Sequence, residues 1–401
     1  MSRKSSLWVL VFSLVLVVVL MTGVVWRQDS PAASQNPEQQ LGVMVEVYQH
    51  IADDYVTTPN LAKVSAGGLS GLLSSLDADS SYLDPAEYRA FLADQNDPPA
   101  AGVQAVFSKR VGYADVVDVR PGGAAAAAGL VRGDFVEAIN DQGTRDLSLE
   151  AIRRMMEGPP GTTVTLSVVH LHHSDPVKVT ITRAVPTPVP LPATLNAGVG
   201  VIHVPDFDAG RARQVAAAVR RLRTQGAHSF ILDLRNSAAG SYTEAEDLAN
   251  VFLDHGTITY LEGQKYPRVT TAADPARAID ATDPLDVLVN FGTFGPAEVA
   301  AAALQQNERA QLIGDDTFGE GSLQKLIPVG DGSAIWLTVA RYYSPKGKLI
   351  EDGLIPNVQQ VQFAGALPSM DFPPEGVTGP LPDLQMQKAL TMAKAAALVH
   401  N

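Results

Sequence analysis

The chain of 401 residues contains no cysteine. That absence excludes disulfide bridges, thiol nucleophiles and thiolate metal sites together. Basic side chains are also few, because 30 Lys and Arg stand against 43 Asp and Glu for a net charge of −13. Binding to a nucleic-acid backbone depends on Lys and Arg that displace counterions, so we expect no nucleic-acid partner. With 46% hydrophobic and 18% charged residues, the chain is not disordered as a whole, and its length suits two or three domains.

Residues 7–26 contain no charged side chain. A helix of about twenty residues spans roughly 30 Å, the thickness of a bilayer core. Arg3 and Lys4 precede this segment, so the positive-inside tendency predicts a cytoplasmic N-terminus. We therefore expect residues 1–27 to anchor the protein in the membrane, with the rest in the periplasm or at the cell exterior of a bacterium. A cleaved signal peptide is the alternative, and it exports the rest of the chain as well.

Polar and helical segments follow the expected anchor. Residues 28–40 are polar and contain proline, which is typical of a linker. Residues 41–97 have a helical pattern, since apolar side chains recur at every fourth position from Val43 to Tyr55. Asp84 stands directly before a proline, a pairing that indicates the start of a helix. This region is predicted to be a helical N-terminal unit.

The remainder divides into a β-rich part and an α/β part. Residues 98–186 consist mostly of short β-branched runs with turns, and one helix is predicted from Leu147 to Glu157. That pattern favours a small, partly open β-barrel. Residues 187–362 alternate strands and helices, and Phe230–Leu234 is an apolar strand of the type buried on both faces. Residues 363–401 form a proline-rich tail that ends in a predicted helix.

Six blocks of sequence stand in one order along the chain. They are LSSLDADSSYLDPAEY at 73–88, GGAAAAAGLVRGDFVEAIN at 122–140, LSLEAIRRMMEGPPGTTVTL at 147–166, FILDLRNSAAG at 230–240, VLVNFGTFGPAEVAAAALQQNERAQLIGDDTFGEGSLQ at 287–324 and ARYYSPKGKLIEDGLIPNV at 340–358. In this order they resemble the carboxyl-terminal processing peptidases (tail-specific proteases), serine peptidases with an inserted PDZ domain. The resemblance covers about residues 40–390. It implies an α/β fold, with a crotonase-like peptidase core, an inserted β-rich PDZ domain, a helical N-terminal region and the transmembrane anchor, and it implies no cofactor.

In that family a Ser-Lys dyad, often assisted by a Gln, hydrolyses peptide bonds. The resemblance puts Gly295 at the serine position, Glu320 at the lysine position and Gln324 at the retained glutamine. Ala239 and Gly240 end the loop that supplies the oxyanion donors, and the family's Pro-Gly turn reads Ala-Ala here. A glycine cannot form an acyl-enzyme, and a glutamate near the developing oxyanion opposes its stabilisation. The sequence therefore predicts a non-catalytic relative.

An active serine endopeptidase with a relocated dyad is the alternative. Ser322 and Lys325 have the Ser-x-x-Lys spacing of other serine enzymes, which works where a helix places both on one face. This segment reads as an extended strand, so the two side chains are expected on opposite faces. Thr293 and Ser241 lie near the expected cleft, but no Lys or His accompanies them in the sequence.

Histidines also raise the question of a metal site. His170 and His172 would lie on one face of a strand, where two imidazoles can bind a metal. No carboxylate motif accompanies them, so the end of a strand is the favoured interpretation. No metal site is predicted.

A PDZ domain captures a protein tail by strand addition, with N–H groups of a loop receiving the terminal carboxylate. The resemblance puts Gln104 where the family loop has its second glycine, and a glutamine adopts the positive φ of glycine less easily. Protein C-terminal tails are thus the predicted partners, with an active paralogue as a further possibility. The residues predicted to bind the peptide are Gly102, Val103, Gln104, Ala105, Ile152 and Met155, with Met156 as the alternative to Met155.

Overall fold

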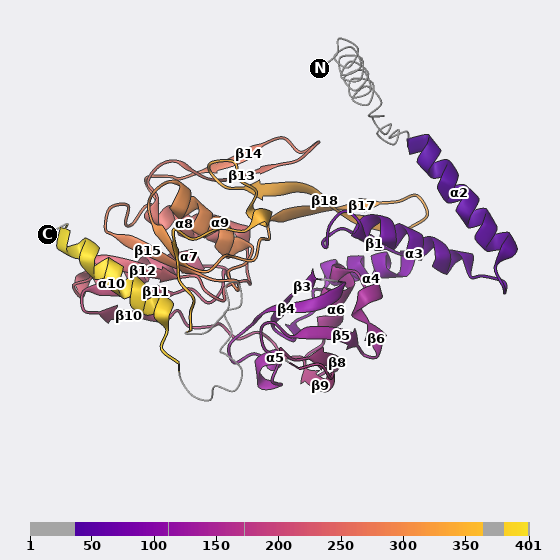
Figure 1. The fold of residues 1–401 in the computed structure, drawn as a ribbon, viewed down its shortest axis with the longest axis horizontal. Coiled ribbons are helices and arrows are strands. Elements are labelled where there is room, and N and C mark those ends of the chain that lie inside the picture. The colour runs from indigo at the N-terminus through magenta and orange to yellow at the C-terminus, as the bar shows by residue number, and fades with distance from the viewer. Residues whose placement is uncertain (1–36, 111, 172, 364–380, 400–401) are drawn as a thin grey trace, which may run out of the picture. The chain divides into compact units, whose positions relative to one another are not determined.

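The computed structural model describes residues 37–110, 112–171, 173–363 and 381–399 (Figure 1). The predicted anchor at 7–26 and most of the predicted linker lie outside these residues. Within the described ranges, no helix has the length and apolar character needed to cross a membrane. The chain divides into two compact units, Met1–Gly67 and Gly68–Asn401.

The first unit contains helix α2 (Pro37–Asp54) and the first half of α3 (Leu61–Ser74). Helix α2 begins inside the predicted linker 28–40, so the last four residues of that range are helical. The reason is local, because a proline occupies the first helical position and Glu38 lies in the first turn, where negative charge favours a helix.

The second unit opens with strand β1 (Ser81–Leu83) and helix α4 (Pro85–Asn96). The helix start predicted at Asp84 is confirmed as a capping box. The Asp84 carboxylate accepts hydrogen bonds from two N–H groups of the first turn, at 2.7 and 2.8 Å, and the Glu87 carboxylate accepts one from Asp84 N at 2.9 Å. Strand β1 pairs with β18 (Ala334–Tyr343), so residues near 80 belong to a sheet of the core.

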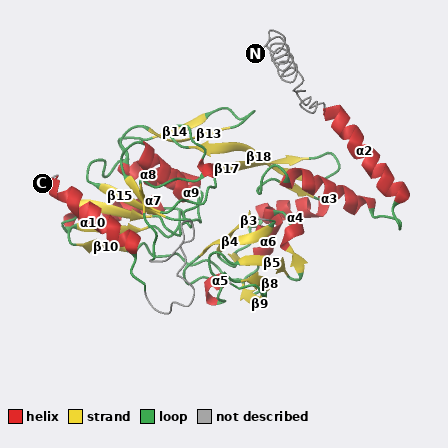
Figure 2. Cartoon of the chain, viewed as in Figure 1, coloured by secondary structure: helices red, strands yellow, loops and turns green. Residues whose placement is uncertain are grey.

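The β-rich part has a sheet in the order β3-β4-β5-β8-β9 (Figure 2). Its strands are β3 (Ala105–Arg110), β4 (Tyr113–Val119), β5 (Phe135–Ile139), β8 (Thr163–Val169) and β9 (Val177–Thr182), with β6 (Gln142–Gly143) beside β5. Strand β2 (Ala101–Gly102) pairs with β7 (Glu157–Gly158), and the helices are α5 (Ala124–Ala127), a 3₁₀ turn (Thr144–Asp146) and α6 (Leu149–Met156). Helix α6 falls within the helix predicted at 147–157 and packs against β3. In the part of the chain that the structure describes, β3 is an edge strand of its sheet, the position at which a further strand can be added.

The core contains a six-stranded sheet in the order β10-β11-β12-β15-β16-β19. Its strands are β10 (Ala193–Asn196), β11 (Val199–His203), β12 (Ser229–Asp233), β15 (Leu285–Val289), β16 (Gln311–Gly314) and β19 (Val358–Gln359). All neighbours pair in parallel except β10, which is antiparallel to β11.

Helices cover both faces of this parallel sheet (Figure 1). They are α7 (Arg211–Thr224), α8 (Tyr242–Phe252) and α9 (Pro296–Gln306) on one face and α10 (Leu384–Val399) on the other. Alternate residues of β12 show the arrangement, since Phe230 and Leu232 pack with α7–α9 and Ile231 packs with α10. Every residue of β12 is buried, as its apolar sequence predicts.

A second, antiparallel sheet is built around β18. Its other strands are β1, β13 (Thr257–Glu262), β14 (Val269–Ala272) and β17 (Ser322–Pro328). Strands β13 and β14 are absent from the sequence prediction. The candidate site lies where loops leave the carboxyl ends of β12 and β15 and where β17 begins, in keeping with the general position of sites in α/β sheets.

Candidate functional site

Two loops that follow β12 and β15 are fixed to each other by side-chain amides. Asn290 Nδ2 donates to Asn236 Oδ1 at 3.0 Å, and Asn290 Oδ1 accepts from Asn236 N at 3.1 Å and from Gly292 N at 3.0 Å. The Thr293 hydroxyl is fully buried and donates to Leu234 O at 2.9 Å. The hydroxyl of Thr293 therefore joins the two loops. This structural role explains why a hydroxyl is buried there, and no role as a nucleophile is needed.

Gly295, the residue predicted at the nucleophile position, forms the turn between β15 and α9. Its φ of 53° and ψ of −107° are strained for a residue with a side chain. A strained turn from strand to helix is the geometry that presents the nucleophilic serine in α/β-hydrolases. A Cβ atom built at this position would lie 3.4 Å from Tyr242 Oη, which leaves room for a small side chain. The turn thus has the shape of a nucleophile position but holds a residue without a reactive atom.

The Tyr242 hydroxyl beside this turn is not an activated nucleophile. Burial, followed by the nearby Glu320 carboxyl, raises the pKa of Tyr242 well above its usual range. Its hydroxyl therefore keeps its proton, and a protonated hydroxyl without a base is a weak nucleophile.

Glu298 holds the predicted nucleophile and base positions together. Its fully buried carboxylate accepts hydrogen bonds through Oε2 from Gly295 N at 3.0 Å and from Glu320 N at 2.8 Å. Through Oε1 it accepts from Gly319 N at 2.7 Å and from the Thr317 hydroxyl. Burial raises the pKa of Glu298 to about 7, although these hydrogen bonds oppose the rise. Since two backbone N–H groups share one oxygen, positions 295 and 320 lie side by side.

The Glu320 side chain belongs to a network that the sequence does not reveal. Ser322 Oγ lies 2.8 Å from Glu320 Oε1 and 3.1 Å from Asp79 Oδ2, and Gln324 Nε2 donates to Ser322 Oγ at 2.7 Å. Arg153 Nη2 of helix α6 lies 3.3 Å from Asp79 Oδ1. Burial and the neighbouring Asp79 carboxyl raise the pKa of Glu320 to about 8. At neutral pH the carboxyl group of Glu320 therefore holds its proton.

Glu320→Gln should stabilise the protein increasingly as the pH rises. The pKa of Glu320 is raised from an ordinary 4.5 to about 8 on folding, so the folded state retains a proton that the unfolded state releases. The contribution of Glu320 to the free energy of unfolding therefore falls between about pH 4.5 and pH 8. Urea unfolding at pH 5, 7 and 9 should show that the free energy of unfolding of the variant, relative to that of the parent protein, increases with pH. The exposed Glu308→Gln is the control, and an offset that is equal at all three pH values would contradict the prediction.

The Ser-x-x-Lys spacing does not form a dyad. Residues 322–328 form strand β17, so the extended conformation predicted for this segment is confirmed. Ser322 is buried and Lys325 is exposed. Ser241 is an exposed cap of α8 that accepts a hydrogen bond from Glu244 N at 3.2 Å. In the part of the chain that the structure describes, neither serine hydroxyl bonds to a Lys or His side chain.

The predicted oxyanion loop is shaped by a close contact with Phe207. Phe207 N donates to Ala239 O at 2.7 Å, and Ser241 N donates to Phe207 O at 3.0 Å. A Cβ atom at Gly240 would lie 2.2 Å from the Phe207 carbonyl carbon, so only glycine fits there. Among the described residues, no acceptor is bonded to the N–H groups of Ala239 and Gly240. They remain available to a carbonyl oxygen of a bound peptide.

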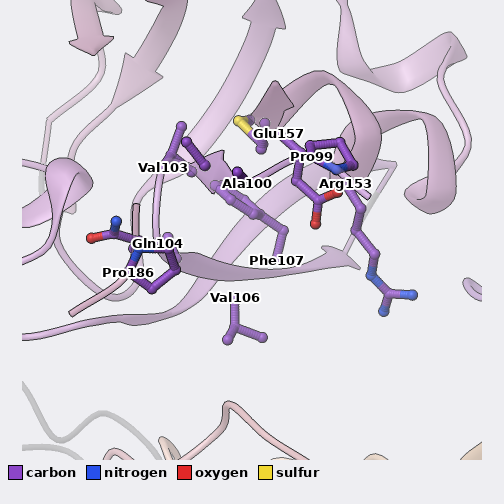
Figure 3. Close-up of a pocket in the computed structure, with 13 residues that line it drawn as sticks. Pro99, Ala100, Val103, Gln104, Val106, Phe107, Arg153, Glu157 and Pro186 are labelled. Atoms are coloured by element: carbon purple, nitrogen blue, oxygen red, sulfur yellow. The ribbon is translucent and has the colours of Figure 1, made fainter. Parts of the chain in front are cut away.

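A pocket of about 340 Å³ lies in the β-rich domain between its first loop, β3 and the end of α6 (Figure 3). Helix α6 and the residue after it contribute Arg153, Met156 and Glu157 to the lining. Ile152 is fully buried in the core of the domain, and Met155 packs against that core. Of the side chains predicted to offer an apolar contact, Met156 is the one that lines the pocket. The other lining residues are Pro99, Ala100, Ala101, Gly102, Val103, Gln104, Ala105, Val106, Phe107 and Pro186.

Gln104 adopts the conformation that a glycine was expected to provide. Its φ is 64°, and its side chain secures it, with Nε2 donating to Ala184 O at 2.7 Å and Oε1 accepting from Ala124 N at 3.1 Å. The backbone of the loop is partly used, since Gly102 N donates to Ala184 O at 3.1 Å and Val103 N to Met156 O at 3.2 Å. A peptide carboxylate at this loop would therefore meet the N–H groups that follow, those of Gln104 and Ala105.

The histidines near 170 do not form a metal site in the residues that can be described. His170 Nδ1 lies 3.0 Å from one carboxylate oxygen, Asp134 Oδ1. No group of three or more His, Asp or Glu side chains suited to a metal ion occurs in the described ranges. His172 lies outside them.

Comparisons with known proteins identify the family. A profile of peptidase family S41 matches residues 198–360, and a PDZ domain profile matches residues 116–169. The carboxyl-terminal-processing protease of a Synechocystis species is 30% identical over 425 residues, covering 100% of this chain and 96% of its own length. The chain belongs to the carboxyl-terminal processing protease family. Its relative from Bartonella bacilliformis, a carboxy-terminal-processing protease, is 30% identical over 331 residues, covering 81% of this chain and 76% of that protein.

The fold of the family is also found among solved structures. The photosystem II D1 C-terminal processing protease matches with a TM-score of 0.65 and 25% identity, covering 80% of this chain and 93% of that one. The S41 match includes Gly240, Gly295, Glu320 and Gln324, so these four predicted site positions lie inside the peptidase core of the family. The PDZ match begins after the loop at 102–105, and the pocket of Figure 3 therefore lies at its edge.

Proposed function

We propose that this family member is a non-catalytic protein that binds the C-terminal tails of other proteins. In this proposal its N-terminal segment anchors it in the membrane, and the rest of the chain lies outside the cytoplasm. The observation that carries the proposal is the pair Gly295 and Glu320, whose N–H groups share one oxygen of Glu298. This is where the family resemblance puts a serine and a lysine. A glycine offers no oxygen to acylate, and a protonated carboxyl accepts no proton from a nucleophile.

The PDZ domain supports the binding half of the proposal. Its pocket is lined in part by the apolar side chains of Val103, Phe107 and Met156, and β3, which also lines it, is an edge strand among the described residues. An extended peptide that adds to such an edge gains backbone hydrogen bonds, and a pocket beside the edge selects a side chain. The N–H groups of Ala239 and Gly240, which have no acceptor among the described residues, offer a second place for a peptide carbonyl.

An active endopeptidase with a relocated dyad is the weaker candidate. Its best nucleophile, Ser322, faces the carboxyl groups of Glu320 and Asp79 and the amide of Gln324. The amine that a Ser-Lys pair requires, that of Lys325, lies on the exposed side of the strand.

A peptide with an apolar end should bind the full chain with micromolar affinity, and amidation of its C-terminus should weaken binding strongly. The reason is that the N–H groups of Gln104 and Ala105 would lose an anionic acceptor. Glu157 lines the same pocket, so Glu157→Gln should tighten binding of the acid form more than of the amide form. Calorimetry with both peptides measures the two effects. Equal affinities for acid and amide would show that the pocket does not receive a terminal carboxylate.

A further inference from the structure

Two consecutive arginines of helix α6 have different partners. Arg154 joins α6 to α4, since its Nε lies 2.8 Å from Asp94 Oδ2 and its Nη1 donates to Glu87 O at 3.2 Å. Arg153 lines the PDZ pocket (Figure 3). Its guanidinium is 3.3 Å from Asp79 Oδ1. The Arg153 side chain is 40% exposed, so it is accessible to a ligand as well as to Asp79. Arg154 thus holds helix α6 to α4, whereas Arg153 contacts both the pocket and Asp79, whose carboxyl group is close to that of Glu320.

The position of Arg153 along the pocket indicates which residue of a bound peptide would lie beside it. The loop end of the pocket lies at Met156, whose carbonyl oxygen accepts from Val103 N. Arg153 is three residues earlier on the helix, a distance of about 4.5 Å along its axis. A strand rises about 3.3 Å per residue, so a peptide that ends at the loop passes Arg153 one or two residues before its last residue.

We propose that Arg153 selects peptides that carry an acidic side chain one or two residues before an apolar C-terminal residue, and that such a peptide draws Arg153 away from Asp79. This inference rests on the proposed function and names the class of tail. Arginine suits the role because its planar guanidinium pairs with carboxylates in a defined geometry. Its contact with Asp79 is long for a charge-assisted hydrogen bond, so the exchange of one carboxylate for another costs little.

The transfer of Arg153 has a consequence for protons in the core. The Asp79 carboxyl favours the protonated form of Glu320, whereas the Arg153 charge opposes it. Removing Arg153 strengthens proton binding at Glu320, so binding of an acidic tail takes up protons and weakens as the pH rises through about 8. The other titratable or charged groups around the carboxyl pair are Tyr242, Glu298, Asp77, Glu351 and Arg341.

Two ten-residue peptides test the proposal. Both end in a free, apolar residue, and they differ only in Glu or Gln at the two preceding positions. Calorimetry with the full chain should show the Glu peptide binding about three to five times more tightly at pH 6.5, as a half-exposed ion pair allows, and equally at pH 9. Arg153→Gln should bring the ratio to about one at both pH values. Arg153→Lys, which keeps the charge without the planar guanidinium, should preserve only part of the preference. Glu320→Gln should keep the preference but remove its dependence on pH.

The outcomes separate this inference from the proposed function. If both peptides bind equally to the parent protein at pH 6.5, or if the preference survives Arg153→Gln, then Arg153 is not the selecting residue. If Glu320→Gln leaves the pH dependence intact, the coupling to Glu320 is wrong. If neither peptide binds, the tail-binding function fails and the selection with it. Arg145→Gln, which alters another arginine of the PDZ domain that lies over Tyr113, is the matched control and should keep the preference.

Discussion

The purified chain should leave an unstructured substrate with an apolar tail intact over hours. Loss of a nucleophile and its base together costs roughly a millionfold in rate, so turnover should fall below detection. Gel electrophoresis and mass spectrometry of the substrate measure the result. The Synechocystis carboxyl-terminal-processing protease, which aligns over the whole chain, serves as the positive control under the same conditions.

Cleavage by the chain itself would contradict this expectation. To count, it must survive the removal of contaminating proteases and disappear in Ser322→Ala. Lys325→Ala is the matched variant, because loss of activity in both would indicate the Ser-x-x-Lys pair. Activity that is lost only in Ser322→Ala would instead point to the carboxyl group of Glu320 as the base.

Gly295→Ser combined with Glu320→Lys should produce little or no cleavage. The structural reason is the carboxyl group of Asp79, which lies beside position 320. A lysine at position 320 would lie beside that carboxyl group, which favours the charged ammonium form. An opposite charge at this range shifts a pKa by about one to three units, so the neutral amine would become roughly ten to a thousand times scarcer. The strained φ of 53° at position 295 adds a further cost for a serine.

Addition of Asp79→Asn to the double variant should therefore raise the cleavage rate by about tenfold or more. It should also move the acidic limb of the pH profile, where the lysine loses its proton, to lower pH. Ala238→Pro with Ala239→Gly should raise it again, since a misplacement of about 1 Å in an oxyanion donor can cost roughly a hundredfold. Neither Gly295→Ser nor Glu320→Lys alone should suffice. If the double variant is equally active with Asp79 present, Asp79 is not the obstacle. If the complete set folds normally and cleaves nothing, the core is a binding scaffold and not a dormant enzyme.

Local signals in the sequence predict local structure well in this chain. The Asp84-Pro85 pair marks a helix start because a cap and a preset φ act within one turn. The apolar run at 230–234 identifies a strand buried on both faces. The absence of a helical pattern after Gly321 places Ser322 and Lys325 on different sides of a strand. Each of these features depends on neighbours in the chain.

Features that depend on distant residues could not be predicted in the same way. Asp79 reaches Ser322 only because β1 pairs with β18, and no motif connects positions so far apart in the sequence. The positive φ of Gln104 is supported by bonds to residues 124 and 184, so the glycine rule alone predicted an obstacle that the side chain removes. The same holds for Arg153, whose two neighbours, the pocket and Asp79, come together only in the folded chain.

Glu298 holds the loops of the candidate site in place without using the side chains at positions 295 and 320. The turn at 295 and the loop at 317–320 are held through backbone N–H groups and one threonine hydroxyl, and none of these bonds uses the side chain at position 295 or 320. A lineage can therefore exchange a nucleophile or a base without first rebuilding the surrounding loops. A change at Glu298 has no such freedom, because it would leave three N–H groups without their buried acceptor. The side chains at positions 295 and 320 are thus open to substitution, whereas the Glu298 carboxylate that holds both loops is not.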